Sequence, residues 1–207
     1  MGVTSETIRG ILLDMALIIE ENKQYLTDLD AAIGDGDHGH NMARGFAAIK
    51  NKLGENSELT PEGLLKTAAM ALISNVGGAS GPLYGTLFLK GAGAIGGKPE
   101  LGLADLAALL REGVEGVKTR GRSDFGEKTM LDVLVPVQRS LESDAAVGIS
   151  CGEALAKAKK LAEECAGKTR NIVATKGRAS YLGERSLGHI DPGAMSSCLL
   201  ISALKER

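Results

Sequence analysis

Three aspartates stand close together in the first fifth of the chain, at Asp30, Asp35 and Asp37. Asp35 and Asp37 alternate with glycines, so the backbone can turn tightly and direct both carboxylates the same way. Asp30 lies about one and a half helical turns earlier and converges with them if the chain bends at Gly34. Converging carboxylates repel one another unless a cation lies between them, and hard oxygen ligands suit Mg²⁺. The spacing therefore predicts a magnesium site, with a solvated acidic loop as the alternative.

Two further segments have the composition of phosphate-binding elements. Residues 74–82 are small and glycine-rich and open a helix, whose free N–H groups and dipole favour an anion. Arg178 could bind a phosphate as a bidentate donor. A plain connection between helices and a surface arginine are the alternatives. Among the histidines, His38 lies beside the aspartates and is a candidate for ligand contact, whereas His40 and His189 are expected to face solvent or to support other side chains.

Some familiar nucleotide motifs can be set aside. Gly91, Gly93 and Gly96 spell the dinucleotide-binding pattern, but Pro99 follows where that motif requires a helix to open. Residues 121–129 resemble a phosphate-binding loop in which Glu127, placed before Lys128, breaks the required Gly-Lys-Thr core. Paired cysteines and the usual zinc-binding histidine motif are missing from the sequence, so a zinc site is not expected.

The composition and periodicity of the chain favour helices as the elements that position these residues. Hydrophobic residues make up 43% of the chain but aromatic residues only 3%, so alanine, leucine and glycine must build the core, as in closely packed helices. Apolar residues recur at three- and four-residue spacing along the chain. About eight helices are expected, around residues 8–19, 42–53, 61–73, 82–94, 103–117, after 129, 153–165 and 192–204.

Helix-start signals support these boundaries. Thr60 and Asp191 each precede a proline, the pattern of an N-cap followed by Pro at the first helical position. Ser150 fits a capping box, Thr129 could cap the helix that follows it, and Pro136 should kink that helix. Strand signals are weak. Short connections make successive helices antiparallel neighbours, so the sequence predicts an all-α single domain over residues 1–207.

The overall charge and the cysteines narrow the function and the environment. The formal net charge is −2 and basic residues form no stripe, so direct binding of nucleic acid is not expected. Three scattered cysteines argue against a disulfide framework and for a reducing cytoplasm. The apolar runs fall short of the roughly 18 residues of a membrane span, so no membrane association is expected.

Several segments, taken in order, resemble the L subunit of bacterial dihydroxyacetone kinase. The resemblance covers essentially the whole chain, and the combination is specific. The segments that carry it are 34–42 (GDGDHGHNM), 77–83 (GGASGPL), 124–130 (DFGEKTM), 176–186 (KGRASYLGERS) and 191–194 (DPGA).

The resemblance implies a barrel of eight antiparallel amphipathic helices with ADP bound at one end. Asp30, Asp35 and Asp37 match the family's ligands for two Mg²⁺ ions, and Arg178 would assist catalysis by binding developing charge on the phosphoryl group. His40 departs from the apolar residue expected at its place. The positions that match the family's nucleotide contacts are His38, Asn41, Ala79, Ser80, Gly121, Met130, Arg178, Asp191, Pro192 and Gly193.

The resemblance also implies partners. A separate chain of this length is similar to the phosphoenolpyruvate-dependent type, in which bound ADP accepts a phosphoryl group from a phosphohistidine on the M subunit of the sugar phosphotransferase system. ADP then passes the group to dihydroxyacetone on the K subunit. Such a chain would be a phosphoenolpyruvate–glycerone phosphotransferase, and a homodimer is plausible. Three alternatives stay open. The chain could be an ATP-dependent keto-sugar or polyol kinase subunit with exchangeable nucleotide, a nucleotide-loaded regulator of a transcription factor, or a structural helical domain with an incidental acidic loop.

Overall fold

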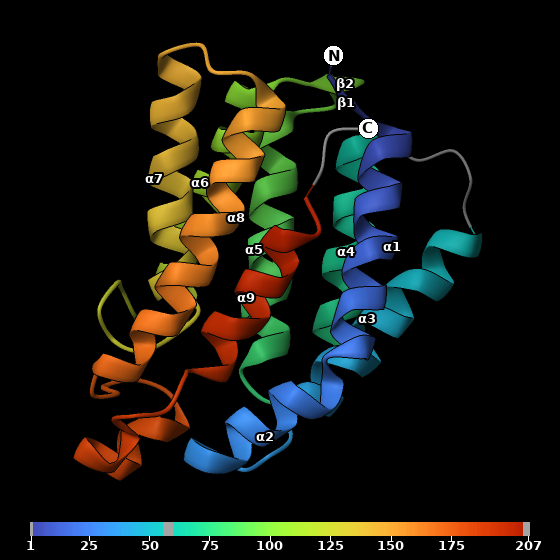
Figure 1. Ribbon diagram of the computed structural model, residues 1–207. Helices are drawn as coiled ribbons and strands as arrows, with labels where there is room; N and C mark the ends of the chain where they lie inside the picture. Colours follow the sequence, from blue (N-terminus) through green and yellow to red (C-terminus); the bar gives the residue numbers. More distant parts are fainter. Residues whose placement is uncertain (1, 56–59, 205–207) are drawn as a thin grey trace.

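The computed structural model describes residues 2–55 and 60–204, which are almost entirely helical (Figure 1). Two-residue strands, β1 (Val3–Thr4) and β2 (Glu100–Leu101), form a short antiparallel pair. The helices are α1 (Ser5–Glu21), α2 (Lys23–Ile33), α3 (His38–Glu55), α4 (Pro61–Asn75), α5 (Ser80–Ile95), α6 (Leu103–Gly121), α7 (Leu131–Ala146), α8 (Cys151–Lys168), α9 (Pro192–Ser202) and the 3₁₀ helices η1 (Thr169–Asn171) and η2 (Arg178–Ser186).

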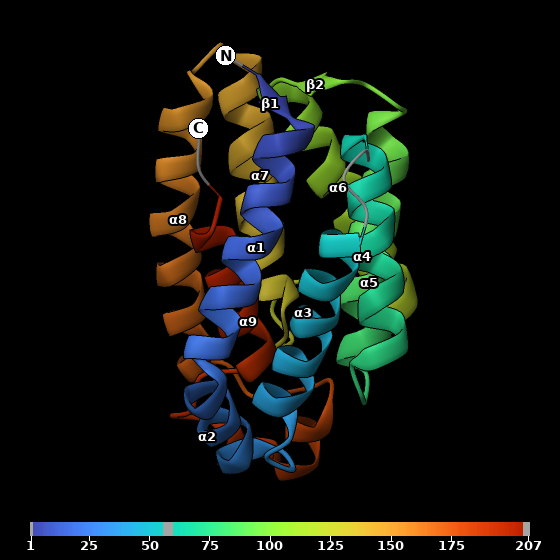
Figure 2. The same cartoon turned by 90° about the vertical axis from the view of Figure 1, so that its right-hand side faces the viewer.

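Eight of the helices form a closed ring. Each of α3 to α9 packs against the helix before it, and α9 returns to α1, which also packs on α3. The helices alternate in direction around an apolar interior (Figure 2). The expected all-α barrel of antiparallel helices is therefore confirmed. No helix of residues 2–55 and 60–204 is long and apolar enough to cross a membrane. The limits expected for a single domain, 1–207, include ends outside the described residues and stay a prediction.

Local capping explains most helix starts. The side chains of Thr60, Ser150 and Asp191 each accept a hydrogen bond from a backbone N–H in the first turn of α4, α8 and α9, which satisfies a group that the helix itself cannot pair. Thr129 accepts from the N–H of Leu131, where α7 begins. The helix continues through Pro136, and the kink expected at this residue stays a prediction.

Two local features differ from the expectation. A separate helix, α2, follows α1 because the chain leaves helical geometry at Asn22, whose side chain donates to the carbonyl of Ile18. This additional helix lies at one end of the barrel (Figure 1) and carries Asp30. The β1–β2 pair lies at the opposite end, where Val3 pairs with Leu101 and both side chains are buried. A strand of two residues is too short to show the alternating pattern from which strands are predicted.

Helices α4, α5 and α6 approach one another closely through glycines. A Cβ placed on Gly85 would lie 2.3 Å from Ile73 Cγ1, and one on Gly113 would lie 2.7 Å from the carbonyl oxygen of Leu87. Larger residues at these two positions would force the helices apart. The three helices therefore form a tightly packed wall of the barrel, and the first turn of α5 brings this wall to the site.

Candidate functional site

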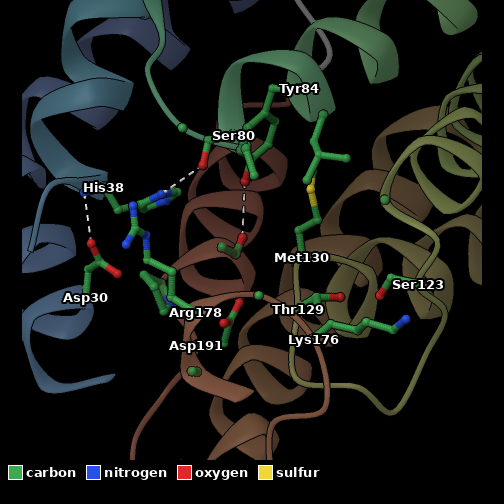
Figure 3. Close-up of a pocket in the computed structure, with 18 of the residues that line it drawn as sticks. Asp30, His38, Ser80, Tyr84, Ser123, Thr129, Met130, Lys176, Arg178 and Asp191 are labelled. Atoms are coloured by element: carbon green, nitrogen blue, oxygen red, sulfur yellow. Dashed lines mark hydrogen bonds between the residues drawn. The ribbon is translucent and has the colours of Figure 1, made fainter. Parts of the chain in front are cut away.

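A cavity of about 460 Å³ opens at the end of the barrel where α2 lies (Figure 3). The alternation of helix direction explains its position. Four helices, α3, α5, α7 and α9, begin at this end, and residues from the start of each line the cavity. Their unpaired N–H groups and the positive ends of their dipoles point toward it, an arrangement that favours a negatively charged ligand.

The three aspartates converge at one side of this cavity. One carboxylate oxygen of each of Asp30, Asp35 and Asp37 lies within 4.8 Å of the others. Asp30 is buried, and its Oδ2 accepts hydrogen bonds from the backbone N–H groups of Asp37 (2.9 Å) and His38 (3.1 Å). At Gly34, which ends α2, an added Cβ would lie 2.1 Å from Asp30 Oδ1. The expected bend at this glycine is therefore confirmed, and it brings Asp35 and Asp37 back toward Asp30.

The donor set fits a hard divalent cation. Oxygens on opposite sides of a Mg²⁺ ion lie about 4.2 Å apart, so the observed spread requires only a small inward movement or a bridging water. Arg178 at the start of η2 places its Nη2 2.8 Å from Asp35 Oδ2. This guanidinium offsets part of the carboxylate charge from the same side of the cavity as Asp30.

His38 connects the carboxylate cluster to the starts of α5 and α9. Its Nδ1 lies 3.1 Å from Ser80 Oγ and its Nε2 lies 2.9 Å from Ser196 Oγ. Burial lowers the pKa of His38, although Asp30 and Asp37 oppose that shift. Both ring nitrogens are thus engaged by hydroxyl groups, and His38 lines the cavity as a fixed part of its wall.

A buried tyrosine extends this polar network. The hydroxyl of Tyr84 lies 2.7 Å from Ser196 Oγ and 2.8 Å from Ser197 Oγ, and it donates to the carbonyl of Gly193. Tyr84 is almost fully buried, and burial is the main cause that raises its pKa. The network fixes the first turns of α9 against α5. Sequence reasoning missed it, because hydroxyl groups spaced far apart along the chain carry no motif.

The glycine-rich connection between α4 and α5 forms another part of the wall. Ala79 and Ser80 line the cavity at the first turn of α5, and their contact with a nucleotide stays a prediction. Asn41 does not line it. Its side chain lies behind the turn, where its Oδ1 accepts from Arg44 and sits close to Gly77. A direct contact between Asn41 and a nucleotide therefore stays a prediction. Its observed role is support of the turn.

The segment between α6 and α7 closes the cavity on the side away from the aspartates. Gly121 and Met130, both expected as nucleotide contacts, line it. Asp132 in the first turn of α7 accepts from the backbone N–H groups of Gly126 (2.8 Å) and Thr129 (2.7 Å). The carboxylate thus holds this connection in one conformation.

Lys128 was set aside in the sequence but has a central place here. It is 1% exposed and adopts a left-handed backbone conformation with a φ of 62°. Its Nζ donates to the carbonyl oxygens of Thr169 (2.6 Å) and His189 (2.5 Å). Burial lowers its pKa, while Asp191 and Asp132 raise it. Lys128 therefore joins the connection before α7 to the segment before α9.

The turn at Asp191, Pro192 and Gly193, expected to contact a nucleotide, completes the wall. Asp191 Oδ2 accepts from the N–H of Ala194, and its own N–H donates to Thr169 Oγ1. Burial raises the pKa of Asp191 to about 7. Of the other histidines, His40 is exposed, with its Nδ1 3.1 Å from Thr27 Oγ1, and His189 is also exposed.

The cavity therefore combines acidic and basic groups in its walls. Beyond Arg178, the basic residues Arg120 and Lys176 line it, and sequence reasoning singled out neither. Three carboxylates that suit a divalent cation face four helix starts and these basic groups. This arrangement can bind an anion of high charge, such as a polyphosphate, together with a metal.

Comparisons with known proteins agree with this geometry. Residues 32–206 match the family described as the DAK2 domain. The chain is 46% identical over 193 residues to the PEP-dependent dihydroxyacetone kinase 1, ADP-binding subunit DhaL, of Listeria innocua, covering 93% of this chain and 91% of that protein. It is also 46% identical to the corresponding Escherichia coli subunit, covering 90% of this chain and 89% of the relative.

A solved structure shows the same fold. The dihydroxyacetone kinase of C. freundii superposes with a TM-score of 0.76 at 24% sequence identity, over 97% of this chain and 34% of that one. The matching family covers most of the chain, and the two bacterial subunits match nearly end to end. The chain therefore belongs to the DAK2 domain family, in the group of the ADP-binding subunits of PEP-dependent dihydroxyacetone kinases.

Proposed function

We propose that this protein is the ADP- and magnesium-binding subunit of a dihydroxyacetone kinase. The observation that carries the proposal is the convergence of Asp30, Asp35 and Asp37 beside Arg178, at the end of the barrel where four helices begin. The names of the bacterial relatives, which describe an ADP-binding subunit of a PEP-dependent dihydroxyacetone kinase, support it.

The residues around the cavity have distinct roles in this proposal. Asp30, Asp35 and Asp37 would hold two Mg²⁺ ions, which supply Lewis-acid stabilisation of phosphoryl charge. The first turn of α5, at Ala79 and Ser80, would receive phosphate oxygens through its N–H groups. Arg178 would turn from Asp35 toward the phosphoryl group and bind charge that develops there.

The other walls would hold the nucleoside. Gly121 and Met130 would contact it from one side, and the turn at Asp191, Pro192 and Gly193 from another. His38, with both nitrogens engaged by hydroxyls, would position Ser80 and the backbone beside Asp30. Phosphoryl transfer depends mainly on such positioning and charge stabilisation.

The proposal also covers the route of the phosphoryl group. ADP would accept it from a phosphohistidine on an M subunit of the phosphotransferase system and donate it to dihydroxyacetone on a K subunit. We further propose a homodimer, and the family resemblance supports contact with a transcription regulator as a second role.

Two measurements test the proposal. The first is to purify the protein without added nucleotide, dialyse it extensively, denature it and identify what it releases by chromatography. Near-stoichiometric ADP supports a captive cofactor. An empty protein that exchanges ATP freely would favour the ATP-dependent alternative, and failure to bind either nucleotide with Mg²⁺ would refute the proposal.

The second measurement uses Asp35→Asn and Asp37→Asn, with Asp28→Asn on α2 as the matched control because Asp28 is exposed and outside the cavity. Both site variants should lose bound nucleotide and phosphoryl transfer together, whereas the control should keep both. Full transfer activity in the two site variants would contradict the role given to the carboxylates. Nucleotide binding without transfer to any K subunit, in the unmodified protein, would favour the regulator.

A further inference from the structure

We propose that Ser123 reads the base of the bound nucleotide. This inference rests on the proposed function, because it takes the phosphates to lie at the carboxylates. The base must then lie toward the opposite side of the cavity. Figure 3 shows Asp30, His38 and Arg178 on one side and Met130, Thr129 and Ser123 on the other.

The walls on that side suit a flat heterocycle. Leu83, Val117 and Met130 line the cavity there with apolar side chains, and Gly121 leaves space between them. A Cβ on Gly121 would lie 3.3 Å from Leu83 Cδ2, so a larger residue would narrow this space. Apolar walls bind the faces of a base but do not distinguish one base from another, which requires a polar group at its edge.

Ser123 supplies such a group. Within residues 2–55 and 60–204, its Oγ is a buried side-chain oxygen without a hydrogen-bond partner, although Ser123 lines the cavity. The pKa of Glu127 is lowered mainly by a hydrogen bond from the N–H of Asp124 and next by its interaction with the Ser123 side chain, but the Ser123 and Glu127 side chains do not meet hydrogen-bond geometry. Buried polar groups are nearly always paired, so a buried hydroxyl without a partner in a cavity wall indicates a ligand that completes it.

The backbone holds this hydroxyl in place. Arg122 closes α6 in a left-handed conformation with a φ of 49°, and the N–H of Ser123 donates to the carbonyl of Lys118. The neighbouring connection is fixed by Asp132. A hydroxyl positioned before the ligand arrives loses little conformational freedom on binding, and it can act as donor or acceptor toward the edge of a base.

The test compares a complete nucleotide with a probe that has no base. The unmodified protein, Ser123→Ala and the control Ser143→Ala would be titrated with ADP and, by displacement of ADP, with inorganic pyrophosphate, both with Mg²⁺. Ser143 is exposed on α7 and does not line the cavity. Ser123→Ala should weaken ADP about 3- to 10-fold, the effect of one neutral hydrogen bond, and leave pyrophosphate unchanged.

Two further readouts separate recognition from structural support. The ratio of ADP to GDP affinity should approach one in Ser123→Ala, and the melting temperature without ligand should stay equal or rise, because the variant removes a buried group without a partner. Unchanged ADP affinity, or equal losses for ADP and pyrophosphate, would overturn the role of Ser123 while leaving the proposed function standing. Unmodified protein that binds neither probe would overturn both.

Discussion

Arg178 Nη2 lies 2.8 Å from Asp35 Oδ2, so the guanidinium bonds directly to one of the three carboxylates that would bind the metal. Arg178 and a divalent cation therefore compete for the same carboxylate. The Arg178 side chain is 66% exposed, so the pair is screened by solvent and contributes at most about 1 kcal/mol. A phosphate group could therefore bind Arg178 in place of Asp35 at a small cost in free energy. Asp35 would then be free to bind the metal.

Arg178→Ala should therefore change metal and nucleotide affinity in opposite directions. Without nucleotide, Mn²⁺ should bind up to about 5-fold more tightly because a competing cation is removed. ADP with Mg²⁺ should bind about 10- to 100-fold more weakly, because charge-assisted hydrogen bonds to phosphate are lost. Calorimetric titrations of both ligands would check this. Weaker Mn²⁺ binding in the variant would show that Arg178 supports the metal site instead of competing with it.

Gly39→Ala should disturb the metal site from outside it. A Cβ at Gly39 would lie 2.0 Å from the carbonyl oxygen of Lys23, so α3 and α2 would have to separate. Unfolding free energy should fall by about 1–3 kcal/mol, and Mn²⁺ affinity should fall because Asp30 moves with α2. The control is Gly93→Ala, where nothing lies near the added atom. It should raise stability by about 0.5–1 kcal/mol. Equal stability in both variants would refute the tight contact.

Lys128→Met should lower both stability and nucleotide affinity. The variant keeps the apolar stem but leaves the carbonyls of Thr169 and His189 without their donor. Loss of these charge-assisted bonds should reduce the unfolding free energy by about 2–4 kcal/mol, measured by urea denaturation. ADP affinity should also fall, because the turn at Asp191 loses its anchor. Lys160→Met, on the exposed face of α8, should change neither.

Asp191→Asn should remove one part of the dependence of stability on pH. The raised pKa of Asp191, about 7, means that the folded protein binds this proton more tightly than the unfolded chain, whose ordinary value is 3.8. The stability gained is present below pH 4 and is lost as the pH rises through about 7. Asparagine also caps α9 but does not ionise.

The measurement for Asp191 is the difference in unfolding free energy between the unmodified protein and Asp191→Asn, from pH 4 to 8. Taking this difference removes the pH-dependent contributions of groups that both proteins contain, including His38. We expect the unmodified protein to lose stability relative to the variant across this interval. The charges near Asp191 are those of Lys128, Asp132 and Asp30. A difference that does not vary with pH would show that Asp191 ionises normally in the folded protein.

The parts of the structure that could be predicted from the sequence are those controlled by neighbouring residues. The caps at Thr60 and Asp191 and the bend at Gly34 depend on a few adjacent residues, and all three are confirmed. The convergence of the carboxylates follows from the bend. Lys128 was missed because its left-handed conformation and buried ammonium depend on carbonyls 41 and 61 residues away.

The remaining differences have the same physical origin. The hydroxyl network of Tyr84, Ser196 and Ser197 joins residues that are 112 and 113 positions apart. The position of Asn41 behind the turn depends on Arg44 and on the end of α4. Such contacts exist only after the helices have packed, so no local pattern in the sequence predicts them.

The glycine contacts between α4, α5 and α6 also bear on motion. Where Gly85 and Gly113 bring backbones together, the amide groups can reach water only if whole helices separate. Amide hydrogen exchange should therefore be slowest in the middle of these three helices and approach the rate set by global unfolding. The connections around the cavity would exchange through smaller openings. The barrel should thus pair a slowly exchanging wall with connections around the cavity whose amide hydrogens exchange faster.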